Sequence, residues 1–157
     1  MASEKLRYLL ARRGAEPPLE LGQVAPCLSR LPPEDLAQII VSAGAYDDVV
    51  RRVMFLHAVF AVVESHSPEK LAQTVRFALD LQGLDIPYNR SGAYGQVPHA
   101  VHTILEALAR RGDKQLALSL CEIAIQKGAE GAESLQDGHS WDMALDDLCA
   151  WRDAQRG

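Results

Sequence analysis

The chain has 157 residues, of which 48% are hydrophobic, 24% charged and 6% aromatic, and its formal net charge at pH 7 is −5. A chain of this length can bury a sufficient core without disulfide or metal cross-links. The hydrophobic content excludes an intrinsically disordered chain, and 11 glycines and 8 prolines are too few for a collagen-like or low-complexity sequence.

The sequence pattern indicates neither a targeting segment nor a set of cysteines that would form disulfides or bind zinc. The first residues, MASEKLRY, combine acids and bases, and the longest apolar stretch, residues 53–63, is far shorter than the roughly 20 residues of a membrane span. The three cysteines are widely spaced and form no Cys-x-x-Cys pair, which argues against disulfides and zinc. We therefore expect a cytoplasmic protein with no cofactor and no membrane partner. An excess of arginine over lysine, 12 to 4, indicates a GC-rich bacterial genome.

The first predicted helices are marked by proline and glycine. One helix is expected over residues 3–13, before Gly14, and a short second one around residues 20–29. A third starts at Pro33, where proline suits the first turn, and is expected to end at Gly44.

The next predicted helix covers about residues 46–64 and differs from its neighbours. From Val49 to Val63 it is apolar on nearly every side, with its charges confined to the two ends. A helix of this kind is typically surrounded by other helices. We therefore expect it to be the buried centre of the core.

Four further helices are expected in the remaining sequence. They cover residues 67–83, 98–111 and 113–127, and an acidic C-terminal helix of about residues 141–153 that starts after Ser140. No segment alternates between apolar and polar residues, so we expect no sheet. The predicted fold is all-α, a single domain over residues 1–157 in which about seven antiparallel helices form a bundle or short superhelix.

Two spacings resemble part of a known family of repeats. Gly112-x4-Ala117-x10-Gly128 and Ser67-x4-Ala72-x10-Gly83 share one frame, and they begin 45 residues apart. This frame is similar to the second half of a helical hairpin in tetratricopeptide or pentatricopeptide repeat proteins. The resemblance implies a scaffold that binds a partner. Capped helices with small residues at their crossings explain the same spacings without a repeat.

A long loop is expected over residues 82–97, between two strongly predicted helices. Connections between packed helices usually take about two to eight residues, and longer ones often carry function. This one contains Tyr88, Asn89, Arg90 and Tyr94. Tyrosine and arginine beside small residues are typical of recognition surfaces. We predict that these four residues bind a partner, although the tyrosines of a long loop can also fold back onto the domain.

Two histidines and a glutamate follow on the next helix. His99, His102 and Glu106 are spaced to share the face opposite the apolar stripe. They are candidates for a site that binds a metal or a small molecule, and such a site could belong to an enzyme. His99 is also predicted to be part of the partner-binding surface. A solvated polar face with a His–Glu pair is the alternative. No catalytic residue is predicted, and whether the chain is an enzyme stays open.

The net charge is concentrated at one end of the chain. Residues 129–157 hold seven acids and two bases, whereas the preceding residues are close to neutral. Asp142, Asp146 and Asp153 form one stripe with Cys149 on the last predicted helix. A solvated face is the commonest role of such a stripe, but this one would attract a basic protein and repel nucleic acid. Our leading hypothesis is a non-enzymatic adaptor or immunity-type inhibitor that recognises a basic protein partner.

Overall fold

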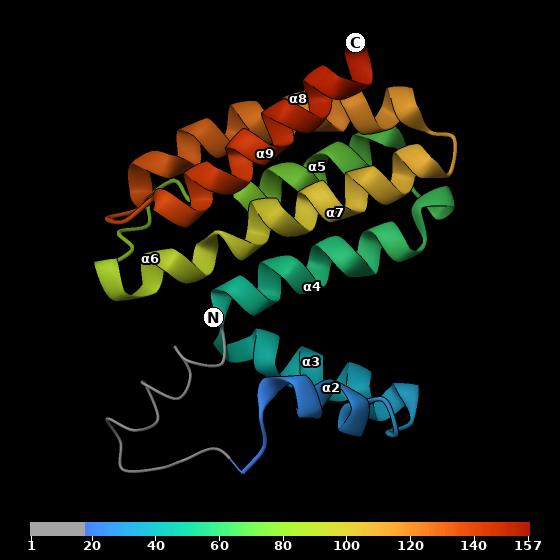
Figure 1. Cartoon of the computed structure of the whole chain (residues 1–157), viewed down its shortest axis with the longest axis vertical. Coiled ribbons are helices and arrows are strands. Elements are labelled where there is room, and N and C mark those ends of the chain that lie inside the picture. Colours follow the sequence, from blue (N-terminus) through green and yellow to red (C-terminus); the bar gives the residue numbers. More distant parts are fainter. Residues whose placement is uncertain (1–17) are drawn as a thin grey trace. The chain divides into compact units, whose positions relative to one another are not determined.

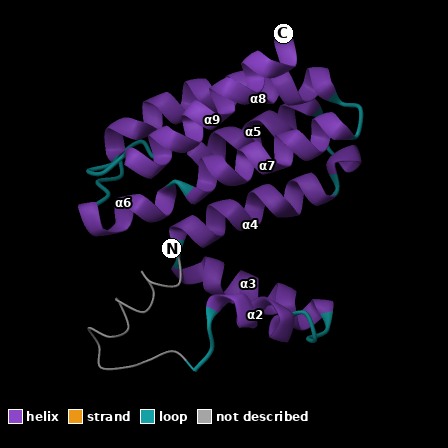
Figure 2. Ribbon diagram, in the orientation of Figure 1, coloured by secondary structure: helices purple, strands orange, loops and turns teal. Residues whose placement is uncertain are grey.

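The computed structural model describes residues 18–157, so the helix expected over residues 3–13 lies outside the described part. All regular elements of residues 18–157 are helices (Figures 1 and 2), which confirms the predicted all-α fold class. Contacts divide the chain into two compact units, Met1–Ile40 and Val41–Gly157. Each unit is described by itself.

The first unit contains α2 (Leu21–Leu28) and the beginning of α3 (Pro33–Tyr46). Glu20 and Gln23 form a capping box at the start of α2, and two acids occupy the first turn of α3. The predicted end of α3 at Gly44 is wrong by two residues. Gly44 does not have the left-handed backbone of a glycine that ends a helix. The absence of a side chain leaves room for Met54, whose side chain lies 3.2 Å from where a Cβ would be.

The second unit is built in two layers. It contains α4 (Asp48–Ala61), η1 (Val63–Ser65), α5 (Pro68–Leu79), α6 (Tyr88–Tyr94), α7 (Gln96–Arg110), α8 (Lys114–Gly131), η2 (Ala132–Ser134) and α9 (His139–Arg156). Helix α7 packs between α4 and α9, and these three form one layer. Helices α5 and α8 pack against each other in the second layer, while α6 contacts α7 and α9 (Figure 1).

Helix α7, and not α4, is the centre of this unit. Helix α7 contacts α4, α5, α8 and α9, and buries Val97, Val101, Leu105 and Leu108 among them. Helix α4 buries one stripe, made of Val49, Arg52, Leu56 and Phe60, while Phe55 and His57 on its other sides are exposed. The prediction of a buried helix over residues 46–64 is therefore wrong, because apolar composition alone does not say how many neighbours a helix has.

The predicted loop over residues 82–97 is also wrong, because α6 occupies its centre. Pro87 lies at the N-cap of α6, and the buried Ser91 hydroxyl donates to the carbonyls of Ile86 and Pro87. Tyr94 and Val97 are buried, so this segment packs onto the domain. The connection between α5 and α6 is therefore limited to residues 80–87, and Gly95 alone separates α6 from α7.

Helix α5 ends at Leu79 rather than near Gly83, and a buried arginine donates hydrogen bonds to the carbonyl oxygens at its end. Arg52, 8% exposed, donates through Nη1 to the carbonyl oxygens of Phe77, Ala78 and Asp80 at 3.0, 3.2 and 2.8 Å. Its Nε donates to Asp48 Oδ2 at 2.9 Å. The guanidinium therefore satisfies backbone groups that a helix end leaves unpaired, and its charge suits the negative end of the helix dipole.

Replacing this arginine should destabilise the second unit. Arg52→Met removes the donors and leaves Asp48 and three carbonyls without this partner, so we expect the free energy of unfolding to fall by about 2–4 kcal/mol. Arg76→Met, an exposed arginine on α5, is the matched control and should change it by less than about 0.5 kcal/mol. Urea denaturation followed by circular dichroism measures both, and equal effects would contradict the role of Arg52.

Two glycines allow α8 to approach its neighbours closely. A Cβ at Gly128 would overlap the Leu145 side chain of α9, and one at Gly131 would lie 2.9 Å from both the Leu79 carbonyl oxygen and the Trp141 ring. The Trp141 Nε1 donates to the carbonyl of Gly128 at 2.8 Å. Helix α8 therefore continues through Gly128, where the sequence predicted its end, because this glycine serves packing.

A methyl group at Gly131 should be poorly tolerated. It meets a backbone oxygen and a buried indole that cannot both move aside, so Gly131→Ala should lower the free energy of unfolding by about 1–3 kcal/mol. At Gly138 an added Cβ meets only Asp142 at 3.5 Å, an ordinary contact, so Gly138→Ala is the control. Thermal unfolding of the two variants compares them, and a neutral Gly131→Ala would show that this contact can relax.

Candidate functional site

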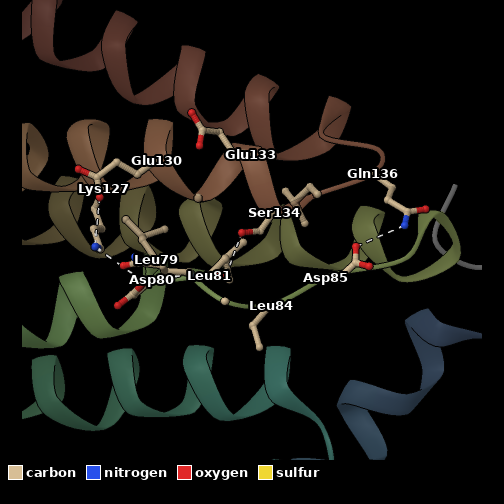
Figure 3. A pocket seen from close by; sticks show the side chains of 14 residues that line it. Leu79, Asp80, Leu81, Leu84, Asp85, Lys127, Glu130, Glu133, Ser134 and Gln136 are labelled. Atoms are coloured by element: carbon tan, nitrogen blue, oxygen red, sulfur yellow. Dashed lines mark hydrogen bonds and ion pairs between the residues drawn. The ribbon is translucent and has the colours of Figure 1, made fainter.

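A cavity of about 560 Å³ opens between the end of α5 and the end of α8 (Figure 3). One wall is formed by residues 79–85, which follow the last turn of α5, and the other by residues 127–136. Although the two segments are about 50 positions apart in the sequence, backbone hydrogen bonds hold them together. The cavity is therefore a built feature of the second unit.

Backbone and side-chain bonds fix the two walls. The Ile86 N–H donates to the Ser134 carbonyl at 3.2 Å, and the Gln136 N–H donates to the Ile86 carbonyl at 3.3 Å, which makes a short parallel bridge. The Ser134 hydroxyl donates to the Leu81 carbonyl at 2.8 Å. Gly83, with a φ of 81°, provides the left-handed turn that this wall needs.

The charge of the cavity is strongly negative. Four carboxylates, those of Asp80, Asp85, Glu130 and Glu133, share the lining with one cation, Lys127. The Lys127 Nζ lies 3.1 Å from Glu130 Oε2 and 3.8 Å from Asp80 Oδ1. Within the described residues no cation is paired with Asp85 or Glu133, so the cavity favours an additional ammonium or guanidinium group.

Sequence reasoning missed this cavity. Glu130 and Glu133 stood out only as part of the acidic C-terminal region, and Asp80 and Asp85 did not stand out at all. The available signal was a pair of acids at or just after the end of each of two helices, where the dipole favours cations instead. That signal becomes meaningful only when residues 79–86 and 127–136 are known to lie together.

Three of the predicted recognition residues lie at the start of α6, beside the cavity. Tyr88 is 70% exposed, and its backbone N–H donates to Gln136 Oε1 at 3.3 Å. The Gln136 amide in turn lies 3.5 Å from Asp85 Oδ1. Asn89 is exposed, and Arg90 pairs with Asp47 at 3.1 Å. The Tyr88 backbone is therefore tied to Gln136 of the cavity lining, and its side chain is exposed.

Tyr94 lies in the core, so it is not part of an exposed contact surface as the sequence suggested. It is 6% exposed, and its hydroxyl donates to Asp48 Oδ2 at 2.9 Å, the same oxygen that accepts from Arg52. Burial, together with the neighbouring Asp48, raises the pKa of Tyr94 to about 12. Tyr94 therefore connects α6 to the Arg52 and Asp48 pair on α4.

A second aspartate of α4 is held ionised. The Asp47 side chain accepts from the Val50 N–H at 3.1 Å as the N-cap of the helix. That hydrogen bond, helped by Arg90, holds the pKa of Asp47 below its usual range. Arg90 is therefore engaged with α4 and only partly available to a partner.

The residues His99, His102 and Glu106 do not form a shared site. His99 is exposed, while His102 is turned toward Trp151 of α9, with 6.1 Å between ring centroids, and its Nε2 lies 3.4 Å from Glu106 Oε1. Among residues 18–157 no group of three or more potential ligands is placed to hold a metal ion. The described geometry gives the proposed metal site no support.

The acidic stripe of α9 is exposed. Asp142, Asp146 and Asp153 all lie on the surface, whereas Cys149 of the same stripe is half-buried. Both arginines of this helix reach across to Glu122 of α8, and Arg152 also bonds Asp153. The bases of α9 are thus largely directed toward α8, which leaves Asp142 and Asp146 without an ion pair in the described structure.

Comparisons with known proteins place this chain in no family: no family model, no curated protein and no solved structure matches it. Within residues 18–157, no helix has both the length and the apolar character needed to cross a bilayer. The interpretation of function therefore depends on the geometry and charge of the site.

The raised pKa of Tyr94 predicts a pH effect on stability. A tyrosine ionises near pH 10 in the unfolded chain and near 12 here, so its contribution to stability is complete below pH 10 and is lost as the pH rises to about 12. Tyr94→Phe lacks this ionisation. Urea denaturation between pH 9 and about pH 12 should show a steeper loss of stability in the wild type than in Tyr94→Phe; parallel profiles would contradict this.

Proposed function

We propose that this protein is a non-enzymatic adaptor or immunity-type inhibitor that binds a basic protein partner. The observation that carries the proposal is the cavity whose lining holds four carboxylates, those of Asp80, Asp85, Glu130 and Glu133, and a single lysine. A lysine or arginine side chain of the partner would enter this cavity. Its charge would meet Asp85 or Glu133, the two carboxylates that Lys127 does not pair with in the described residues.

The surroundings of the cavity support recognition of a protein rather than of a lone ion. Tyr88, whose backbone N–H is bonded to Gln136, has an exposed side chain that can pack against an aliphatic stem or a cation. Asp142 and Asp146 add negative charge on α9, which would speed the approach of a basic surface. An acidic surface of this kind disfavours nucleic acid.

The arrangement of the helices supports a scaffold role. Helices α5 and α8, which contain the two frames similar to tetratricopeptide or pentatricopeptide repeats, pack side by side in one layer. Helices α4, α7 and α9 form the other layer. A repeat-like stack of this type binds partners with rigid surfaces rather than by loop closure. The family relation itself remains part of the proposal.

Neutralising the two unpaired carboxylates should weaken binding to cationic peptides. We expect the double variant Asp85→Asn, Glu133→Gln to bind a fluorescein-labelled octa-arginine peptide at least about tenfold more weakly than the wild type, because about 1.4 kcal/mol of charge pairing is lost. Fluorescence anisotropy at low and at physiological salt measures the affinity. The substitutions keep the side-chain shape, so folding should be preserved.

A charge-matched control separates the cavity from general electrostatics. The exposed carboxylates of Glu69 and Asp113 lie on other helix ends, and Glu69→Gln with Asp113→Asn changes the net charge equally. If this control weakens binding as much as the cavity variant, the cavity is not the binding site. If the wild type binds octa-glutamate as well as octa-arginine, the proposed basic partner is wrong.

A further inference from the structure

The acidic cavity already holds one cation, the ammonium group of Lys127. Lys127 lies on α8 three residues before Glu130, and its side chain extends toward Asp80 on the opposite wall (Figure 3). The Nζ atom lies 3.1 Å from Glu130 Oε2 and 3.8 Å from Asp80 Oδ1. The chain's own ammonium therefore pairs with two of the four carboxylates that line the cavity.

Asp80 keeps its position without help from Lys127. Its Oδ1 atom accepts a hydrogen bond from the Gln82 N–H at 3.0 Å, and its carbonyl oxygen accepts one from Arg52 Nη1 at 2.8 Å. The Asp80 side chain is 45% exposed. Because the turn after α5 and a buried guanidinium hold this residue, its carboxylate can pair with a different cation when Lys127 moves away.

Lys127 is held less firmly than Asp80. Its ammonium is held by two ion pairs with partly exposed carboxylates, and pairs of this kind contribute little to stability. Glu130 lies on the same helix, so the flexible four-carbon stem of the lysine can turn away from Asp80 while the ammonium stays near Glu130. Displacing Lys127 from Asp80 therefore costs little free energy.

The lysine changes the charge that a partner meets. Four carboxylates and one ammonium give the lining a formal charge of −3, and the same lining without the ammonium would carry −4. A cation that approaches Asp80 or Glu130 meets the like charge of Lys127 at the same place. Like charges a few ångströms apart repel, most strongly where water is partly excluded. Lys127 therefore opposes the entry of a second cation at this end of the cavity.

We propose that Lys127 is a tethered competitor of the partner's cation: its ammonium occupies the cavity in the free protein and is displaced from Asp80 when a basic partner binds. This inference rests on the proposed function, because a competitor matters only where a basic partner uses the cavity. A partner must supply enough charge to replace the contacts of the lysine. Lys127 therefore discriminates against weakly basic surfaces.

Removing the ammonium should strengthen binding. Lys127→Met keeps an unbranched side chain but lacks the charge, so it should bind the labelled octa-arginine peptide at least about threefold more tightly than the wild type. Lys127→Arg keeps a charge that can pair with both carboxylates, so it should bind no more tightly than the wild type. Fluorescence anisotropy measures the affinities, and thermal unfolding shows that each variant is folded.

Lys114→Met is the matched control for this gain in affinity. Lys114 is exposed at the start of α8, outside the cavity lining, and its replacement changes the net charge of the protein equally. It should increase the affinity for octa-arginine much less than Lys127→Met does. An equal gain in the two variants would overturn the proposal, because general charge would then explain it, and so would unchanged or weaker binding by Lys127→Met.

The displacement can also be followed directly. The chain has four lysines, so the NMR spectrum of the isotope-labelled ammonium groups is simple, and the Lys127→Met variant identifies the signal of Lys127. Saturating octa-arginine should move this signal and leave that of Lys114 in place. A Lys127 signal that stays unchanged while the peptide binds would overturn the displacement.

The same measurements separate this inference from the proposed function. If Asp85→Asn, Glu133→Gln weakens binding but Lys127→Met does not strengthen it, only the competitor is wrong. If the double variant binds as tightly as the wild type while Lys127→Met binds more tightly, the competitor is supported and the assignment of Asp85 and Glu133 is wrong. If neither the wild type nor Lys127→Met binds the peptide, both proposals are overturned.

Discussion

The second unit depends on one buried guanidinium. Arg52 joins three elements that are distant in the sequence: it pairs with Asp48 on its own helix, caps the last turn of α5, and shares Asp48 with the Tyr94 hydroxyl of α6. A buried charge is costly unless all its hydrogen bonds are formed, so the three elements must take these positions together. This explains why α5 stops where it does.

The end of α5 in turn determines the cavity. Because the chain leaves the helix at Leu79, residues 80–86 form a wall that turns at Gly83 and reaches Ser134 and Gln136 beyond α8. Asp80, the first residue after α5, thereby lies 3.8 Å from Lys127. The acidic site is therefore linked to the core through backbone geometry, and a change at Arg52 affects both stability and the cavity.

The sequence predicted helix boundaries well where the residues that mark a boundary also make its hydrogen bonds. Ser67 caps α5 by accepting from the Lys70 N–H at 3.2 Å, and Pro68 occupies the first turn, as expected from the sequence. The failures occurred where a distant residue decides. Leu145 packs on Gly128, which lies inside α8, and the Tyr94 hydroxyl at the end of α6 donates to the half-buried Asp48 on α4. Neither contact can be predicted from the neighbouring sequence.

The features of the candidate site fall into the same two groups, those that local sequence predicts and those that depend on distant residues. The acidic character of α9 and the exposure of Tyr88 followed from composition, whereas the cavity required two segments to be brought together.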